Sequence, residues 1–231
     1  MSKITPMLEQ YLEIKEKHKD CILFYRVGDF YEMFFDDAVT ASKVLEITLT
    51  GKSFGQPERA PMCGVPFHSC DPYINKLVEN GYRVAICEQV EDPALAKGIV
   101  KRDVIRIVTP GTNLSDQSME EGKNNYLMSV FCQSGSYGAA VCDVSTGEFR
   151  TTQFSSTEDI LDEINKLEPA EIICNDAFCI CGLDFEFIKD KIGTVLTALA
   201  SYYFEEEHCK KLLLEQYHLM NLEGTGITEY P

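Results

Sequence analysis

The sequence has no tryptophan, only four histidines and no long apolar run. Its apolar stretches fall well short of the ~18 residues that a membrane-spanning helix needs. The first residues, Met-Ser-Lys-Ile-Thr-Pro, lack the apolar segment of a secretory signal. We therefore expect a soluble protein that stays in the cytoplasm and has no membrane partner. An apolar content of 45% with 25% charged residues also excludes a disordered chain, a collagen and a coiled coil.

Basic residues are scarce, and they are distributed unevenly along the chain. The 231 residues carry 21 Lys and Arg against 37 Asp and Glu, a formal net charge of -16. Residues 1–113 hold 14 basic and 16 acidic side chains, whereas residues 114–231 hold 7 and 21. The second half should therefore repel a phosphate backbone. The first half could still meet DNA through a local patch, because one ten-residue stretch gathers Lys97, Lys101, Arg102 and Arg106.

Cysteine pairs with Cys-x-x-Cys spacing are absent, although the chain has ten cysteines. A zinc-ribbon site is therefore not supported. Many of the cysteines lie within apolar runs, where a free thiol behaves as a small buried hydrophobe. Without a secretory signal, reduced thiols are expected. Cys174, Cys179 and Cys181 could together bind a soft metal, but we predict no metal site in this chain.

Alternating helix and strand patterns in the first half predict an α/β architecture. The patterns predict helices over 6–18, 36–46 and 71–80 and strands over 21–27, 47–49, 83–87 and 104–108. The segment 52–61 contains Gly55, Pro57 and Pro61, and these residues predict a loop. The fold class expected from this half is a mixed sheet covered by helices.

A change of composition near residue 113 predicts a second α/β domain. We expect a first domain over 1–113, a polar linker over 114–125 and a second domain over 126–231. Three apolar segments separated by tight turns predict an antiparallel meander with strands at 126–132, 137–143 and 148–154. The rest of the second domain predicts a helix over 156–166, a strand over 170–174 and helices over 193–203 and 205–217.

Two short motifs point toward an enzyme, and neither is complete. Residues 51–53, Gly-Lys-Ser, resemble the end of a phosphate-binding loop but lack its upstream glycine, so we predict no nucleotide-binding motif and no enzymatic activity here. Asp143 lies at the end of a predicted strand, just before a tight turn, and so resembles the first metal ligand of RNase H-like nucleases. Glu148 and Asp162 are its candidate partners for two-metal chemistry. The favoured alternative is that Asp143 supports the turn at 145–147 by hydrogen bonding.

The segment 28–35, Gly-Asp-Phe-Tyr-Glu-Met-Phe-Phe, places an aromatic and an acidic side chain two residues apart after a turn. If the backbone stays extended after the turn, Phe30 and Glu32 point to one side and Tyr31 to the other. Spacing alone favours a plainer interpretation, in which Phe30 is a core residue beside a surface acid.

Four motifs change that interpretation. They are Phe-Tyr-Arg-Val-Gly-Asp-Phe-Tyr-Glu at 24–32, Pro-Met-Cys-Gly-Val-Pro-Phe-His at 61–68, Ala-Ile-Cys-Glu-Gln at 85–89 and Arg-Ile-Val-Thr-Pro-Gly-Thr at 106–112. Together they resemble the N-terminal part of the bacterial DNA mismatch-repair MutS family. The resemblance implies a mismatch-recognition domain at 1–113 and, at 126–231, a connector domain with an RNase H-like fold and no nuclease activity.

The resemblance also implies that this chain is a fragment of a larger DNA-dependent ATPase. No cofactor is expected in the fragment, since ATP and Mg would bind only in the missing ATPase domain. The implied partners are double-stranded DNA with mismatches or small loops, MutL, the remaining domains of the same protein and a second copy in a homodimer.

In the family motif, the resemblance implies that Phe30 enters the minor groove and stacks on a mispaired base, with Glu32 beside it. Candidate contacts to the DNA backbone are Lys52, Arg59, His68, Lys97, Arg102 and Arg106. Two alternatives stay open. The chain could be a docking and transmission module that binds no DNA alone, or a metal-dependent nuclease that uses its second domain.

Overall fold

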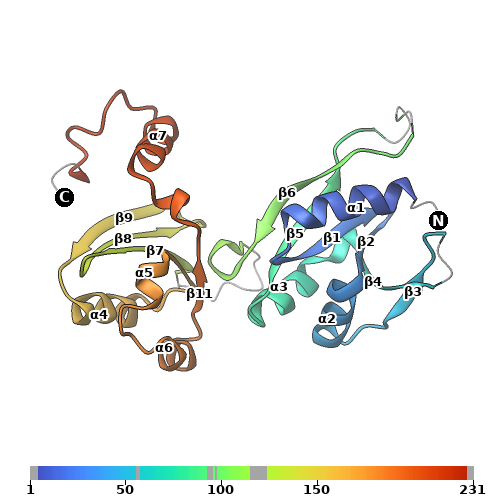
Figure 1. The fold of residues 1–231 in the computed structure, drawn as a ribbon, viewed down its shortest axis with the longest axis horizontal. Coiled ribbons are helices and arrows are strands. Elements are labelled where there is room, and N and C mark those ends of the chain that lie inside the picture. The colour runs from blue at the N-terminus through green and yellow to red at the C-terminus, as the bar shows by residue number, and fades with distance from the viewer. Residues whose placement is uncertain (1–4, 56–57, 93–95, 97, 115–123, 228–231) are drawn as a thin grey trace. The chain divides into compact units, whose positions relative to one another are not determined.

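The computed structural model describes residues 5–55, 58–92, 96, 98–114 and 124–227. The chain divides into two compact units, Met1–Ser118 and Met119–Pro231, and each is built on one β-sheet with helices packed against it (Figure 1). The predicted fold class, two α/β domains, is confirmed. Most of the predicted linker at 114–125 lies outside the described residues. None of the described helices is long and apolar enough to cross a membrane.

The first unit contains a six-stranded sheet in the order β3-β4-β2-β1-β5-β6. Its strands are β1 (Cys21–Val27), β2 (Phe30–Phe34), β3 (Thr50–Lys52), β4 (Ala60–Pro66), β5 (Arg83–Gln89) and β6 (Arg102–Val108). Strands β1 and β5 run parallel, and the other neighbouring pairs are antiparallel. The α-helices are α1 (Pro6–Lys17), α2 (Phe35–Leu45) and α3 (Asp71–Glu79), and 3-10 turns lie at Phe67–Ser69 and Pro110–Thr112.

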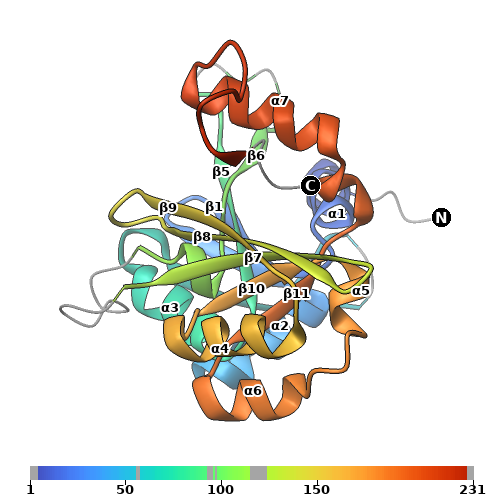
Figure 2. The same ribbon diagram turned by 90° about the vertical axis from the view of Figure 1, so that its left-hand side faces the viewer.

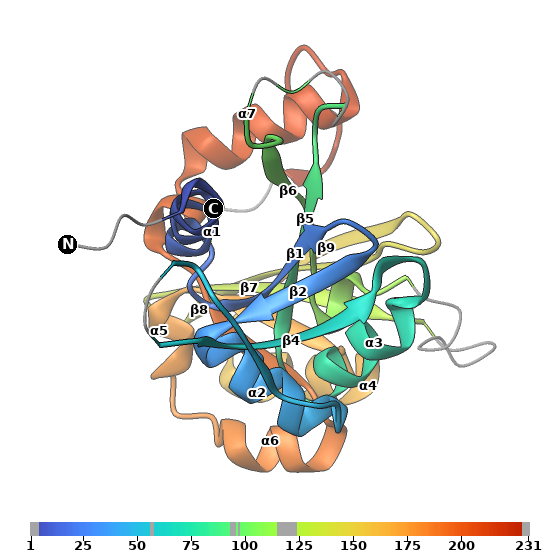
Figure 3. The same cartoon turned by 90° about the vertical axis from the view of Figure 1, so that its right-hand side faces the viewer.

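Both faces of this sheet are covered. Figure 3 shows α2 and α3 on one side of the strands and α1 on the other. Along β1, Ile22 and Phe24 join the core beneath α2 and α3, while Leu23 and Tyr25 join the core beneath α1. A strand buried on both faces reads as a continuous apolar run, which is why 21–27 was predictable from sequence. Helix α1 was predictable too, since the Thr5 side chain accepts a hydrogen bond from the Leu8 amide and caps it.

The predicted strand at 47–49 is wrong. Helix α2 ends at Leu45. The next residue, Glu46, has a left-handed φ of 60°, and the Ile47 amide donates a hydrogen bond back to the Ser42 carbonyl at 3.1 Å. Ile47 therefore completes the helix terminus, and Leu49 is 45% exposed. The edge strand β3 begins at Thr50.

The predicted loop over 52–61 is also too long. Lys52 ends β3 and Ala60 begins β4, and these two residues face each other in the antiparallel register. The proline content of the segment predicted the loop, but Pro61 pairs opposite Gly51 within the sheet. The pairing of β4 with β2 ends at Met62, so Pro61 has a strand partner only on the β3 side. A strand position that is open on one side tolerates proline, which has no amide hydrogen to donate.

The second unit contains a five-stranded sheet in the order β11-β10-β7-β8-β9. Its strands are β7 (Tyr126–Gln133), β8 (Ser136–Asp143), β9 (Glu148–Phe154), β10 (Glu171–Cys174) and β11 (Val195–Ala198). The predicted antiparallel meander β7-β8-β9 is confirmed, and β10 runs parallel to both β7 and β11. The helices are α4 (Thr157–Leu167), α5 (Asp176–Cys179), α6 (Phe185–Ile192) and α7 (Glu206–Tyr217), with a 3-10 turn at Ser201–Phe204.

The main core of this unit lies on one face of its sheet. Figure 2 shows α4 and α6 on that side and α7 on the opposite side. Met128 and Val130 of β7 are fully buried against Ile160 and Ile164 of α4. Helix α7, by contrast, buries none of its residues.

The predicted helix at 193–203 is wrong. This segment holds β11 and then a 3-10 turn, while the preceding residues form α6, which the sequence interpretation missed. Strand β11 exists because its backbone pairs with β10, with Val195 opposite Glu171. Such pairing joins residues far apart in the chain, and local periodicity does not report it.

Candidate nucleic-acid interface

Phe30 lies at the start of β2, directly after the turn at Gly28 and Asp29. Gly28 has a φ of 56°, a left-handed conformation that glycine adopts without strain. The Phe30 side chain is 48% exposed, whereas Tyr31 and Met33 are 5% and 0% exposed. Because β2 is extended, Phe30 and Glu32 share one face and Tyr31 points into the core on the other. Phe30 is therefore a presented aromatic ring, and the interpretation of it as a core residue is wrong.

Arg26 braces the turn that carries Phe30. Its Nε donates a hydrogen bond to the Gly28 carbonyl at 2.5 Å. Its Cζ lies 3.2 Å from the centroid of the Phe67 ring, in a cation–π contact. The Phe67 amide in turn donates to the Asp29 carbonyl at 3.0 Å. The turn is thus held both from its own strand and from the segment after β4, which restricts the ring at its tip.

Glu88 of β5 connects this brace to the sheet. Its Oε1 accepts from Arg26 Nη1 at 3.1 Å and also from the Tyr31 hydroxyl. Burial raises the pKa of Tyr31, and the hydrogen bond to Glu88 raises it further, so the phenol stays a neutral donor. Three strands therefore meet at one carboxylate beneath the Phe30 turn.

Glu32 forms an ion pair with Lys52, which comes from the edge strand β3. The side chains of Glu32 and Lys52 are 15% and 25% exposed, so the pair is partly buried yet open to solvent. On the neighbouring strand β4, Gly64 lies opposite Glu32, and Ala60 lies opposite Lys52. A Cβ at Gly64 would come within 3.2 Å of the Tyr31 carbonyl oxygen, which is a tight contact with the backbone of β2, and it would reach Glu32 Cγ at 3.7 Å, an ordinary contact distance. Beside Phe30, the sheet thus presents a carboxylate whose charge is already paired.

The other predicted cations are placed very differently. His68 is exposed in the turn after Pro66, which is the register partner of Phe30, so it lies next to the aromatic tip. Arg59 is exposed beside β3 and donates to the Gly51 carbonyl. Arg106 is exposed on β6, at the opposite edge of the sheet from Lys52. Lys97 lies outside the described residues.

Arg102 is engaged within the first unit. Its Nε donates to the Arg26 carbonyl at 2.6 Å, and its Nη1 donates to the Val100 carbonyl at 2.9 Å and to Gln10 Oε1 at 3.1 Å. Its Cζ also lies 5.0 Å from the centroid of the Tyr25 ring. These contacts tie β6 to β1 and α1. Lys52 and His68 therefore lie near Phe30, whereas the guanidinium of Arg102 connects elements within the first unit.

Comparison with known protein families decides the identity. The model of MutS domain I matches residues 5–117, and the model of MutS domain II matches residues 125–231. The chain belongs to the MutS family. The resemblance drawn from the four sequence motifs is thereby confirmed.

Curated relatives of this MutS-family chain match all or most of its length. The DNA mismatch repair protein MutS of Lachnoclostridium phytofermentans is 54% identical over 230 residues, covering 100% of this chain and 25% of that protein. The protein of the same name from Acetivibrio thermocellus is 56% identical over 210 residues, covering 90% of this chain and 24% of that protein. This chain spans about a quarter of the length of the curated relatives it matches.

Arg26 and Glu88 are the residues of this site that sequence reasoning missed. Both lie within the MutS-family motifs quoted above, but no role was predicted for them. Strands β1 and β5 pair in parallel with Tyr25 opposite Cys87, so the next residue along each strand is one of this oppositely charged pair. The signal is a basic and an acidic residue at the ends of neighbouring strands, and it becomes visible only once the pairing is known.

Asp143 supports its turn, as the favoured interpretation predicted. It is 1% exposed, its Oδ1 accepts from the Ser145 amide at 2.9 Å and hydroxyl at 2.6 Å, and its Oδ2 accepts from the Asn125 amide at 3.3 Å. Burial raises the pKa of Asp143, but these hydrogen bonds outweigh it and hold the pKa below its ordinary value. Glu148 pairs with Arg150 at 2.9 Å. Within the described ranges, no three His, Cys, Asp or Glu side chains gather to hold a metal ion.

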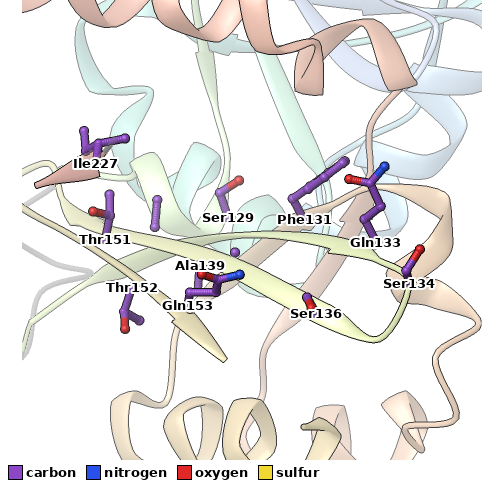
Figure 4. A pocket seen from close by; sticks show the side chains of 12 residues that line it. Ser129, Phe131, Gln133, Ser134, Ser136, Ala139, Thr151, Thr152, Gln153 and Ile227 are labelled. Atoms are coloured by element: carbon purple, nitrogen blue, oxygen red, sulfur yellow. The ribbon is translucent and has the colours of Figure 1, made fainter. Parts of the chain in front are cut away.

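A pocket of about 520 Å³ lies in the second unit, on the β7-β8-β9 meander (Figure 4). Ser129 and Phe131 of β7 and Thr151 of β9 line it, together with Ile227 near the end of the described chain. The twelve described lining residues include no acidic, basic, histidine or cysteine side chain. The described lining of the pocket therefore carries no charged side chain, and its chemistry suits contact with neutral groups.

Proposed function

We propose that this chain recognises mismatched or unpaired bases in duplex DNA as the N-terminal part of a DNA mismatch repair protein. The observation that carries the proposal is the half-exposed Phe30 ring on a braced turn, beside the paired Glu32 and Lys52. An aromatic wedge in the minor groove unstacks one base step and kinks the duplex. Unstacking costs a few kcal/mol, and less where base pairing is already defective. Phe30 would thus read local deformability more than base identity.

Glu32 would sharpen this discrimination. A carboxylate in a groove lined by phosphates is unfavourable unless its charge is balanced or it accepts a hydrogen bond. In the free chain Lys52 balances it. We propose that Lys52 turns toward a phosphate when DNA arrives and that Glu32 then accepts a hydrogen bond from a displaced base. Intact duplex offers no such donor, so the uncovered carboxylate penalises it.

The cations proposed to contact the DNA backbone differ in position and in the contacts that each already makes within the chain. Contacts from Lys52, Arg59 and His68 would position the wedge without reading sequence. Arg106 would reach a phosphate only at the far edge of the sheet, and the proposal for Lys97 rests on sequence alone. Arg102 would contribute least, because its guanidinium already serves three acceptors within the unit.

The second unit suits protein contacts better than DNA. Residues 114–231 carry 21 acidic against 7 basic side chains, and such a surface repels phosphates. We propose that it is an RNase H-like connector that transmits between the recognition unit and the rest of a longer cytoplasmic protein. ATP and Mg binding, ATP hydrolysis and the main homodimer contacts would belong to that remainder, and MutL would dock on the assembled protein.

A binding titration tests the recognition function. Fluorescence anisotropy at low salt would compare a G·T heteroduplex with the matched homoduplex, using the unchanged chain, Phe30→Ala and Phe187→Ala. Phe187 is the matched control, since it is 63% exposed but lies in the second unit. We expect preference for the heteroduplex in the unchanged chain and Phe187→Ala, and its loss in Phe30→Ala. Equal affinity of the unchanged chain for both duplexes would contradict recognition by this chain alone and favour the docking module.

A further inference from the structure

Two thiols of the second unit lie in contact. Cys174 Sγ and Cys179 Sγ are 3.6 Å apart. Cys174 is the last residue of β10 and is fully buried, while Cys179 is the last residue of α5 and is half-buried. Both are free thiols. Among the described residues, no other pair of cysteines lies within hydrogen-bond contact, although the chain has ten.

The fold around the pair holds this geometry in place. Between β10 and α5, the Asn175 side chain forms two hydrogen bonds of 2.9 Å with the backbone amide and carbonyl of Cys132. Phe178, the residue before Cys179, is fully buried and packs edge-on against Phe185 with ring centroids 5.1 Å apart. Both ends of the short segment from Cys174 to Cys179 are therefore fixed by the core, and the two sulfurs stay neighbours.

We propose that Cys174 and Cys179 form a dithiol modification site that small-molecule disulfides, such as oxidised glutathione, convert to an intramolecular disulfide. The two sulfur atoms are already in contact at 3.6 Å, and they must approach to about 2.05 Å in the disulfide. Nothing in this step depends on DNA binding, so the proposal stands apart from the recognition function.

The two thiols take different parts in the reaction. Cys179 is accessible, so its thiolate attacks one sulfur of oxidised glutathione and expels one glutathione thiolate. Cys174 then loses its proton to that thiolate and attacks Cys179 Sγ, which expels the second glutathione. The protein gives up two electrons and two protons, and one oxidised glutathione takes them up to become two reduced molecules. Burial, and then the hydrogen bond with Cys179, raises the pKa of Cys174 to about 12, which keeps it a thiol until its partner has been modified.

Cys209, another half-buried cysteine, provides an internal standard for reaction with glutathione. Cys209 donates to the Tyr203 carbonyl at 3.3 Å and has no thiol neighbour, so it can form only a mixed disulfide with glutathione. At Cys179 the second thiol is supplied within the same molecule, at an effective concentration in the millimolar range or above. The intramolecular bond therefore forms under more reducing conditions than any mixed disulfide.

The test equilibrates the whole chain in glutathione buffers with a rising oxidised share, blocks free thiols by alkylation and maps the peptides by mass spectrometry. We expect the Cys174–Cys179 disulfide at an oxidised share about tenfold lower than that which half-modifies Cys209. Cys174→Ala should leave glutathione on Cys179, Cys179→Ala should leave Cys174 unmodified, and Cys142→Ala should change neither result.

The readout on the unchanged chain keeps the test valid even if a variant folds poorly. Cys174 that stays free while Cys209 already carries glutathione would overturn the proposal. So would a disulfide from Cys179 to Cys181 in place of Cys174.

Discussion

The two units share a sheet-and-helix plan but cover their sheets differently. In the first unit, β1 is buried on both faces, and α1 alone buries three residues. In the second, the residues of β7 alternate between buried and half-buried, and α7 on the other side buries none. A sheet enclosed on both faces has only its edges, strand ends and turns left for function, and Phe30 lies at such a turn. A sheet with one open face keeps that face available for other contacts.

The largest expected difference in stability is between substitutions at two positions of β2 in the first unit. Phe34 is fully buried between Tyr11 and Phe54, whereas Phe30, four residues earlier, is half exposed. We expect Phe34→Ala to lower the free energy of unfolding by about 3–5 kcal/mol and Phe30→Ala to lower it by less than ~1 kcal/mol. Urea denaturation of both variants measures this. Similar losses would mean that Phe30 belongs to the core and is not presented.

The next largest effect concerns DNA binding, compared between Phe30 of the first unit and Phe187 of the second. We expect Phe30→Ala to weaken binding to a heteroduplex by about 1–3 kcal/mol, the range seen for one aromatic–base stack. Binding to homoduplex should change much less, since no stack forms there. The anisotropy titration with Phe187→Ala as control measures both affinities. A uniform loss on both duplexes would assign Phe30 to general DNA contact.

Two buried aspartates, one in each unit, should make the stability of the two units depend on pH in opposite directions. Asp143 has a lowered pKa, so it binds fewer protons when folded, and its contribution to stability is lost as pH falls below the ordinary value of about 3.9 toward the folded value. Asp37 of the first unit, 8% exposed beside Lys15, has a raised pKa because burial outweighs its hydrogen bonds from Lys15 and the Leu23 amide. Its unfavourable contribution is relieved as pH falls through that raised value.

We therefore expect Asp143→Asn to destabilise the second unit by about 1–3 kcal/mol at neutral pH, through loss of charge-assisted hydrogen bonds, and by less at low pH. The unchanged first unit should gain stability as the pH falls through the raised pKa of Asp37, and Asp37→Asn should remove this gain. Urea midpoints measured by hydrogen exchange in each unit from pH 7 to pH 3 separate the two. If the stability of both units changed with pH in the same way, the opposite pKa shifts of Asp143 and Asp37 would be contradicted.

The smallest expected effect is at the Lys52–Glu32 pair. A double-mutant cycle with Lys52→Met and Glu32→Gln should give a coupling of about 0.5–1 kcal/mol in the free chain, because the pair is only partly buried. Lys52→Met should also reduce the salt dependence of DNA binding by roughly one unit. Lys76→Met is the control, since Lys76 pairs with Glu46 at 2.8 Å in an exposed position. An unchanged salt slope in Lys52→Met would remove Lys52 from the DNA contacts.

Much of the fold was predictable from sequence where the deciding interactions are local. Helix α1 follows from a capping Thr5 and a helical apolar pattern, and β1 follows from a continuous apolar run. The same holds for Asp143, whose hydrogen bonds reach a turn only two residues away. The exposure of Phe30 agrees with the interpretation drawn from the family motif, whereas its spacing alone favoured a core position, and its contact with DNA stays a proposal.

Other features were decided only by the tertiary structure. Strands β3 and β11 exist through pairing with β4 and β10, and the brace of Arg26 on Glu88 joins residues 62 positions apart. Lys52 meets Glu32 only because β3, β4 and β2 are neighbours in one sheet. Local patterns act over a few residues of chain, but strand register and ion pairs depend on which distant segments the buried core brings together.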